Sequence, residues 1–116
     1  LGDEAKIADF VRQKARFDAR PPLRSEDARL VGARLTRVGT TPAVQYRYIV
    51  AGHPVTVVQT PAPLDTERAR GLEAAVRFVG DRGRHGVGVF EDHGLQNAAI
   101  GEMPGKDLLR LVPASY

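Results

Sequence analysis

The feature that most constrains the fold is the alternation of apolar and polar side chains between residues 30 and 60. A two-residue period is typical of β-strands that bury one face. Because glycine- and proline-containing turns divide this region, three strands are predicted, at residues 30–38, 44–50 and 55–60. The short turns favour antiparallel neighbours, so the three strands should form a meander. The residues expected to share a face are Val31, Ala33 and Leu35 in the first strand, and Val44, Tyr46, Tyr48 and Val50 in the second.

The chain before this region follows the period of an amphipathic helix instead. Its apolar stripe at helical spacing is formed by Ile7, Phe10 and Val11. A helix is therefore predicted over residues 3–18. Pro21 and Pro22 then exclude helix, because proline lacks an amide hydrogen and favours extended geometry in the residue before it. We therefore expect three parts along the chain: an amphipathic helix within residues 1–18, a connector over 19–28 and an α+β body over 29–116.

The later part of the body contains a second hairpin signal. Residues 84–90 and 95–100 are strand candidates, and Gly94 in the turn between them can adopt positive φ. A short C-terminal helix is predicted over residues 104–112. Residues 65–79 fit either a helix or, at their end, a short strand. The predicted fold class is α+β, with a mostly antiparallel sheet of about five strands between an N-terminal and a C-terminal helix.

The size and charge of the chain exclude several classes. Its 116 residues, 42% of them apolar, are the size of one domain, which we expect to span residues 1–116. There is no cysteine, which excludes disulfides, thiolate catalysis and cysteine-bearing zinc fingers. The net charge of +3 is small and is carried mostly by scattered arginines, so we expect no nucleic-acid partner.

Candidate metal ligands come from the three histidines and one neighbouring carboxylate. They are His53, His85, His93 and Asp92. Zinc and copper need three or four converging donors, and no helical HxxxH or HExxH spacing brings two of these histidines together. Whether they converge depends on the fold. The alternative function is therefore a small-ligand or metal-binding domain, with zinc or copper as the metal, that uses these histidines.

Signals for enzymatic chemistry are weak. Ser25 and Ser115 do not sit in a nucleophile-elbow pattern, and the glycines between residues 80 and 88 precede a strand rather than the helix that a phosphate loop requires. The sequence therefore predicts a protein that is not an enzyme, with no catalytic residue and no organic cofactor.

The order of the strand segments resembles a known family. The runs that carry the resemblance are LVGARL at residues 30–35, PAVQYRY at 42–48, HPVTVV at 53–58, GVGVF at 86–90 and GLQNAAIGEMP at 94–104. Together with the amphipathic segment at residues 9–17, they are similar to the extracytoplasmic region of membrane-bound, zinc-finger-type anti-sigma factors. Residues 65–82 have no counterpart in this resemblance.

The resemblance implies a regulatory role. A sigma-binding cytoplasmic domain and one membrane helix would then lie upstream of Leu1, an expectation that fits a chain whose only methionine is Met103. The 116 residues would then be the periplasmic sensor region of an inner-membrane protein. The partners of that protein would be the sigma factor and a regulatory protease. We also expect Ile7, Phe10 and Val11 to form an interaction surface, with a homodimer through this stripe or a sheet edge.

Overall fold

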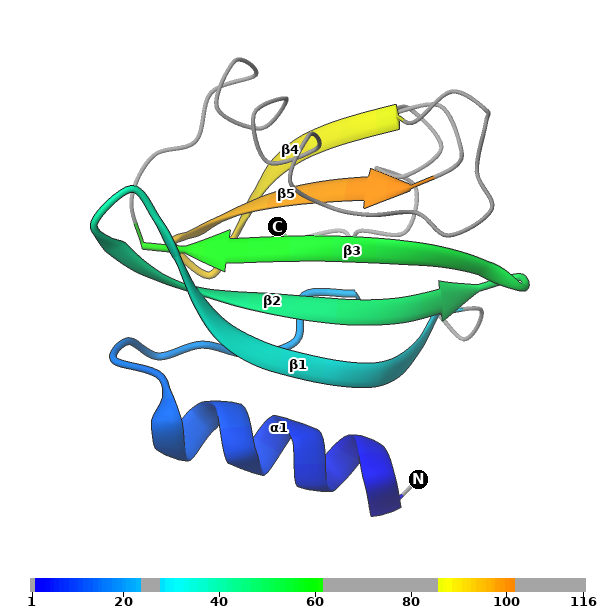
Figure 1. Cartoon of the computed structure of the whole chain (residues 1–116), viewed down its shortest axis with the longest axis horizontal. Coiled ribbons are helices and arrows are strands. Elements are labelled where there is room, and N and C mark those ends of the chain that lie inside the picture. The colour runs from blue at the N-terminus through cyan, green and yellow to red at the C-terminus, as the bar shows by residue number, and fades with distance from the viewer. Residues whose placement is uncertain (1, 24–27, 62–85, 102–116) are drawn as a thin grey trace.

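A computed structural model of the chain describes residues 2–23, 28–61 and 86–101 (Figure 1). Its elements are α1 (Gly2–Lys14), β1 (Ala28–Val38), β2 (Thr41–Val50), β3 (His53–Thr60), β4 (Gly86–Asp92) and β5 (Leu95–Gly101). The strands form one antiparallel sheet in the order β1-β2-β3-β5-β4. The predicted five-stranded sheet with an N-terminal helix is thus confirmed. The helix predicted over residues 104–112 and the ambiguous segment 65–79 lie outside the described residues.

Three two-residue turns connect the hairpins. The residues that close them pair as Val38 with Thr41, Val50 with His53, and Asp92 with Leu95. Positive φ occurs at Gly39, at Ala51 and Gly52, and at His93 and Gly94. Two successive positive values are typical of type I′ turns, whose twist matches that of the flanking strands. The turns are therefore tighter than the gaps of four or five residues between the strands predicted from the sequence, and the strands extend further into them.

A β-bulge in β1 changes which of its side chains face the core. The register shifts between Leu30 and Gly32, so Val31 has no partner in β2 and is 45% exposed. A bulge adds one residue to one strand and so reverses the alternation beyond it. The prediction that Val31 shares a face with Ala33 and Leu35 is therefore wrong. Leu30 faces the core instead: it is buried and pairs with Tyr48 of β2.

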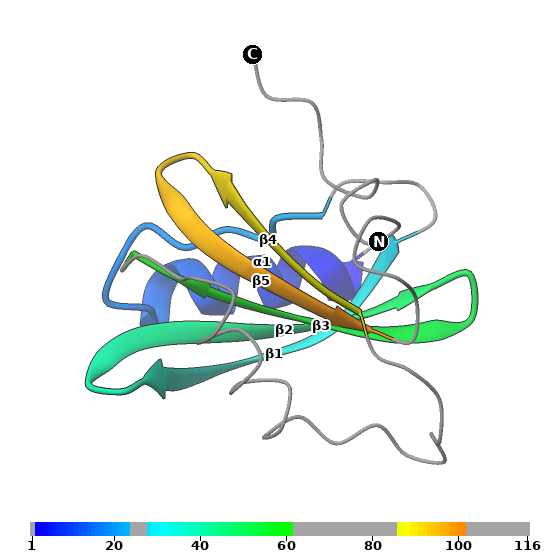
Figure 2. The same ribbon diagram turned by 90° about the horizontal axis from the view of Figure 1, so that it is seen from above.

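One face of the sheet carries the main core. The predicted buried face of β2 is confirmed. The strand residues of this cluster are Leu30, Val44, Tyr46, Tyr48, Val50, Val55, Val57 and Ala99. The rings of Tyr46 and Tyr48 lie 6.4 Å apart at a tilt of 42°, within the range of favourable aromatic pairs. Figure 2 shows α1 and the segment that follows it on the same side of the sheet.

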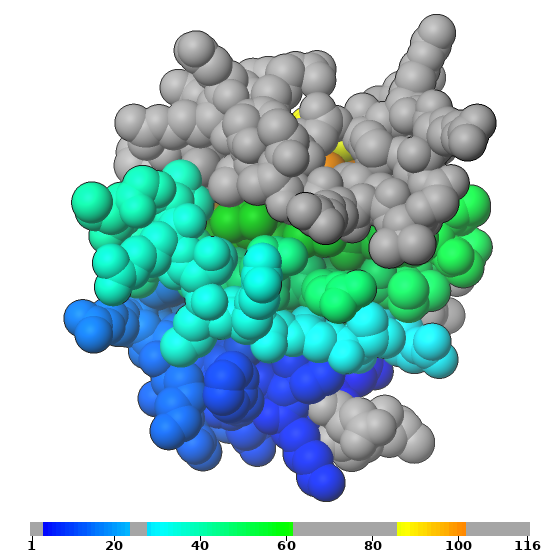
Figure 3. All heavy atoms as spheres, in the orientation of Figure 1, coloured from blue at the N-terminus to red at the C-terminus, as the bar shows by residue number. Residues whose placement is uncertain are grey.

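Helix α1 covers this face along the edge strand β1, against which it lies in the space-filling view (Figure 3). Val11 is completely buried, and Ile7, one turn earlier, packs against the same cluster. Phe10 points elsewhere and is 44% exposed. The three residues of the predicted stripe are therefore divided between the core and the surface. In the described part of the chain, no helix is long and apolar enough to cross a membrane.

The helix ends at Lys14, four residues earlier than predicted. The chain then bends and continues without regular structure as residues 15–23, which we call the strap. Ala19, Pro22 and Leu23 in the strap are buried. A further helical turn would carry these side chains away from the sheet, so burial of the strap outweighs continuation of the helix.

The packing of α1 predicts a difference between two neighbouring substitutions. Val11→Ala should lower the free energy of unfolding by about 2 kcal/mol, because it removes buried methyl groups and leaves a cavity. Phe10→Ala should lower it by less than about 1 kcal/mol, because nearly half of Phe10 is already exposed to water. Urea denaturation of both variants measures the difference. Equal losses would contradict the described orientation of α1.

Candidate functional site

The side chain of Gln59, in β3, holds the strap on the sheet. Its amide oxygen accepts hydrogen bonds from the backbone N–H of Arg20 at 3.0 Å and from the hydroxyl of Tyr46 at 2.9 Å. Its amide nitrogen donates to the carbonyl oxygen of Arg20 at 2.8 Å and to Oδ1 of Asn97 at 3.0 Å. A glutamine side chain offers two donors and two acceptor sites, so all four are used. We call these four residues the Gln59 cluster.

The Gln59 cluster is buried, which makes each of its hydrogen bonds costly to lose. Gln59, Tyr46 and Asn97 are completely inaccessible to solvent. Asn97 also donates from Nδ2 to the carbonyl oxygen of Leu95 at 3.2 Å. A buried polar group left without a partner costs about 1–3 kcal/mol, more than the net gain from a satisfied bond. The cluster therefore specifies one position for the strap.

Two further bonds attach the N-terminal region on either side of the cluster. The backbone N–H of Leu23 donates to the hydroxyl of Tyr48 at 3.3 Å. The backbone N–H of Leu30, on edge strand β1, donates to the carboxylate of Glu4 in α1 at 3.1 Å. The helix, the strap and the sheet are thus connected by backbone groups that have no sheet partner to bond with.

The phenol of Tyr46 is strongly perturbed. Burial raises its pKa well above the ordinary value, and the neighbouring Tyr48 raises it further. The hydroxyl therefore remains protonated at every physiological pH, and its hydrogen can be donated to Gln59 throughout.

Two of the four predicted metal ligands lie together at the β4–β5 turn. Nδ1 of His93 lies 3.0 Å from Oδ1 of Asp92, whose side chain is 4% exposed. The other carboxylate oxygen of Asp92 is buried and has no hydrogen-bond partner among the described residues. His93 occupies the first turn position with φ of 53°, a conformation that histidine adopts more readily than most residues. The pair fixes the orientation of a partly exposed imidazole.

His53 lies at the opposite end of the sheet. It begins β3, next to the end of β5, whereas His93 precedes the start of β5. The length of β5 separates the two histidines by about 20 Å. His85 lies outside the described residues. Within those residues, no group of three or more His, Cys, Asp or Glu side chains could hold a metal ion.

The three predicted interaction residues, Ile7, Phe10 and Val11, do not form one exposed surface. Ile7 and Val11 pack against the chain's own sheet, and only Phe10 remains as a large apolar group on the surface of α1. The sequence did not indicate Gln59, although the signal was present. It lies two positions after Val57 and four after Val55, so it is the polar member of an apolar strand face.

Comparison with known proteins adds no relative: no family model matches the chain, and neither a curated protein nor a solved structure is detectably similar to it.

The Gln59 cluster predicts a large effect from one substitution. Gln59→Leu should lower the free energy of unfolding by roughly 3–5 kcal/mol, because it leaves the polar groups of Arg20, Tyr46 and Asn97 without their partner. Gln45→Leu is the matched control, since within the described residues the side chain of Gln45 bonds only the exposed Arg34. Its loss should stay within about 0.5 kcal/mol. Denaturation measured by circular dichroism compares them, and similar losses would refute the structural role of the cluster.

The raised pKa of Tyr46 predicts a loss of stability in alkali. Its phenol ionises in the unfolded chain near pH 10 but not in the folded protein, so its contribution is complete below about pH 10 and declines above it. The decline approaches about 1.4 kcal/mol per pH unit for this group. Tyr46→Phe should show a shallower decline in the free energy of unfolding between pH about 9 and about 11. Identical slopes in the two proteins would contradict the burial of the phenol.

Proposed function

We propose that the chain is a non-enzymatic sensor module, the extracytoplasmic region of a membrane-bound anti-sigma factor that controls release of its sigma factor. The observation that carries the proposal is the attachment of α1 and the strap to the sheet through the Gln59 cluster. A sensor needs an element with two states whose balance an external event can shift. The N-terminal segment is such an element, because it belongs to no strand and is held by a few polar contacts and four buried apolar residues, Val11, Ala19, Pro22 and Leu23.

The strength of this attachment suits a switch. Two hydrogen bonds of Gln59 join the strap to the sheet, and together they have a net value of about 1–3 kcal/mol, since each is worth about 0.5–1.5 kcal/mol once the freed groups are hydrated. A change of about 5.5 kcal/mol moves a two-state equilibrium from one extreme to the other. Attached and detached forms of the strap are therefore within reach of a ligand or partner.

The placement of the switch also suits a membrane-anchored parent. In proteins of the resembled family the membrane helix precedes the sensor region, so α1 would be the element nearest the membrane. Detachment of the strap would lengthen the chain between the membrane and the sheet and expose it to a regulatory protease. The partners of this proposal are the sigma factor, bound by a domain upstream, and that protease.

The metal-binding alternative has less support. The described residues join His93 with Asp92 but leave His53 at the far end of the sheet, and two donors do not make a zinc or copper site. The Asp92–His93 pair resembles half of a catalytic arrangement. Within the described residues no serine and no cysteine is present to serve as its nucleophile.

Fusion reporters test the proposed location. Alkaline phosphatase fused after Tyr116 of the full-length parent protein should be active in cells, and green fluorescent protein at the same position should be dark. These outcomes are expected because phosphatase requires disulfides that form outside the cytoplasm. Fluorescence without phosphatase activity would overturn the proposal.

A sigma-dependent reporter tests the proposed switch. Gln59→Leu in the full-length parent should raise reporter expression several-fold without a signal, whereas the Gln45→Leu control should behave as wild type. An immunoblot of the membrane fraction follows proteolysis of the parent. An unchanged reporter, with the strap of the Gln59→Leu chain shown by amide exchange to be detached, would refute the switch.

A further inference from the structure

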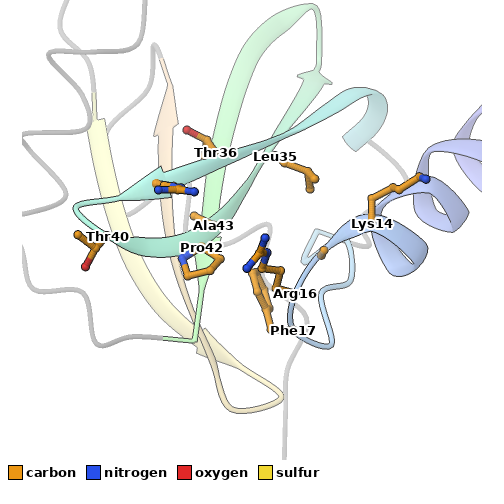
Figure 4. A pocket seen from close by; sticks show the side chains of 10 residues that line it. Lys14, Arg16, Phe17, Leu35, Thr36, Thr40, Pro42 and Ala43 are labelled. Carbon is orange, nitrogen blue, oxygen red and sulfur yellow. The ribbon is translucent and has the colours of Figure 1, made fainter.

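A basic pocket lies between the strap and the outer end of the β1–β2 hairpin (Figure 4). Its volume is about 550 Å³. The strap contributes Arg16 and Phe17 from one side, while Leu35 and Arg37 of β1 and Pro42 of β2 contribute from the other. A molecule in this pocket would touch the strap and the sheet at once.

The charge of the pocket is positive. Arg16 and Arg37 are exposed, and no ion pair within the described residues involves either of them. Lys14 lies at the rim with its ammonium group directed away from the other side chains (Figure 4). No carboxylate is among the described residues that line the pocket. Cations that line the same pocket repel one another, and an anion between them would relieve this repulsion.

The carbonyl groups at the end of α1 weaken this attraction only slightly. The C-terminus of a helix carries about half a negative charge, and α1 ends at Lys14 next to the pocket. The two arginines and Lys14 carry full charges, so the field at the pocket remains positive.

The pocket also has an apolar side. Leu35 is 46% exposed and points toward the strap, where Phe17 lies across from it, and Pro42 of β2 also lines the pocket (Figure 4). An exposed leucine beside a phenylalanine offers apolar surface that a hydrocarbon chain or ring can cover. A small inorganic anion would use the charges but leave this surface in water.

We infer that this pocket binds a small amphipathic anion, a carboxylate with a medium-length hydrocarbon tail. The carboxylate would accept hydrogen bonds from the guanidinium groups of Arg16 and Arg37, and the tail would cover Phe17 and Leu35. Because the ligand would touch the strap and the sheet, its binding would stabilise the attached form. Its role as the sensed signal rests on the proposed function, whereas the binding itself does not.

The test is a titration of the 116-residue chain followed by amide NMR, with octanoate as the probe. Octanol supplies the same tail without charge, and inorganic phosphate supplies charge without a tail. Octanoate should shift the amides of residues 15–17, 35–37, 40, 41 and 43 in a saturable way, and the two comparison molecules should not saturate these shifts at the same concentration. Arg37→Ala and Arg16→Ala should each weaken octanoate binding roughly three- to tenfold, as expected for a partly exposed charge.

Arg47→Ala is the matched control, because Arg47 is an exposed arginine of the neighbouring strand that does not line the pocket. It should bind octanoate as wild type does, and the dispersion of each spectrum reports whether the variant is folded. The inference is overturned if octanoate causes no localised shifts, if phosphate saturates the same amides as readily, or if Arg47→Ala weakens binding as much as Arg37→Ala. Failure here leaves the reporter experiments unaffected, so the two proposals can fail separately.

Discussion

The hydrogen bonds between the side chain of Gln59 and the backbone of Arg20 are the interaction on which the rest of the structure depends. The strap contains two prolines and belongs to no strand, so its backbone groups cannot be satisfied by the sheet ladder. One amide side chain, projecting from the sheet, bonds both the N–H and the carbonyl group of one strap residue. This pairing lets irregular chain lie buried on a sheet face, and it fixes where α1 can pack.

The other two hydrogen bonds of the Gln59 side chain connect the two halves of the described sheet. Gln59 lies on β3, at the junction between the β1–β2 hairpin and the β4–β5 hairpin. Its bonds reach Tyr46 on one side and Asn97 on the other. The strap therefore rests on a cluster to which both hairpins contribute, and a disturbance of either hairpin would be transmitted to the N-terminal segment. This arrangement is what makes the N-terminal segment a suitable switch element in the proposed function.

The sequence predicted the sheet because alternation and turn composition are local signals. The burial of Tyr46 and Tyr48 and the positive φ of Gly94 followed directly from those patterns. The bulge at Val31 could not be predicted, because one unpaired residue leaves no trace in composition. The early end of α1 and the burial of the strap depend on contacts with residues about 40 positions away, such as Gln59. The separation of His53 from His93 likewise follows from strand register, which no spacing of histidines reveals.

The bulge in β1 has a consequence for association between copies of the chain. An edge strand presents free backbone groups that can template a strand from another molecule, which is a route to aggregation. In β1 the bulge interrupts the flat edge, the N–H of Leu30 is occupied by Glu4, and exposed arginines recur along the strand at positions 29, 34 and 37. Charge and irregularity of this kind oppose edge-to-edge growth. These features make β1 a poor template for a strand from a second copy of the chain.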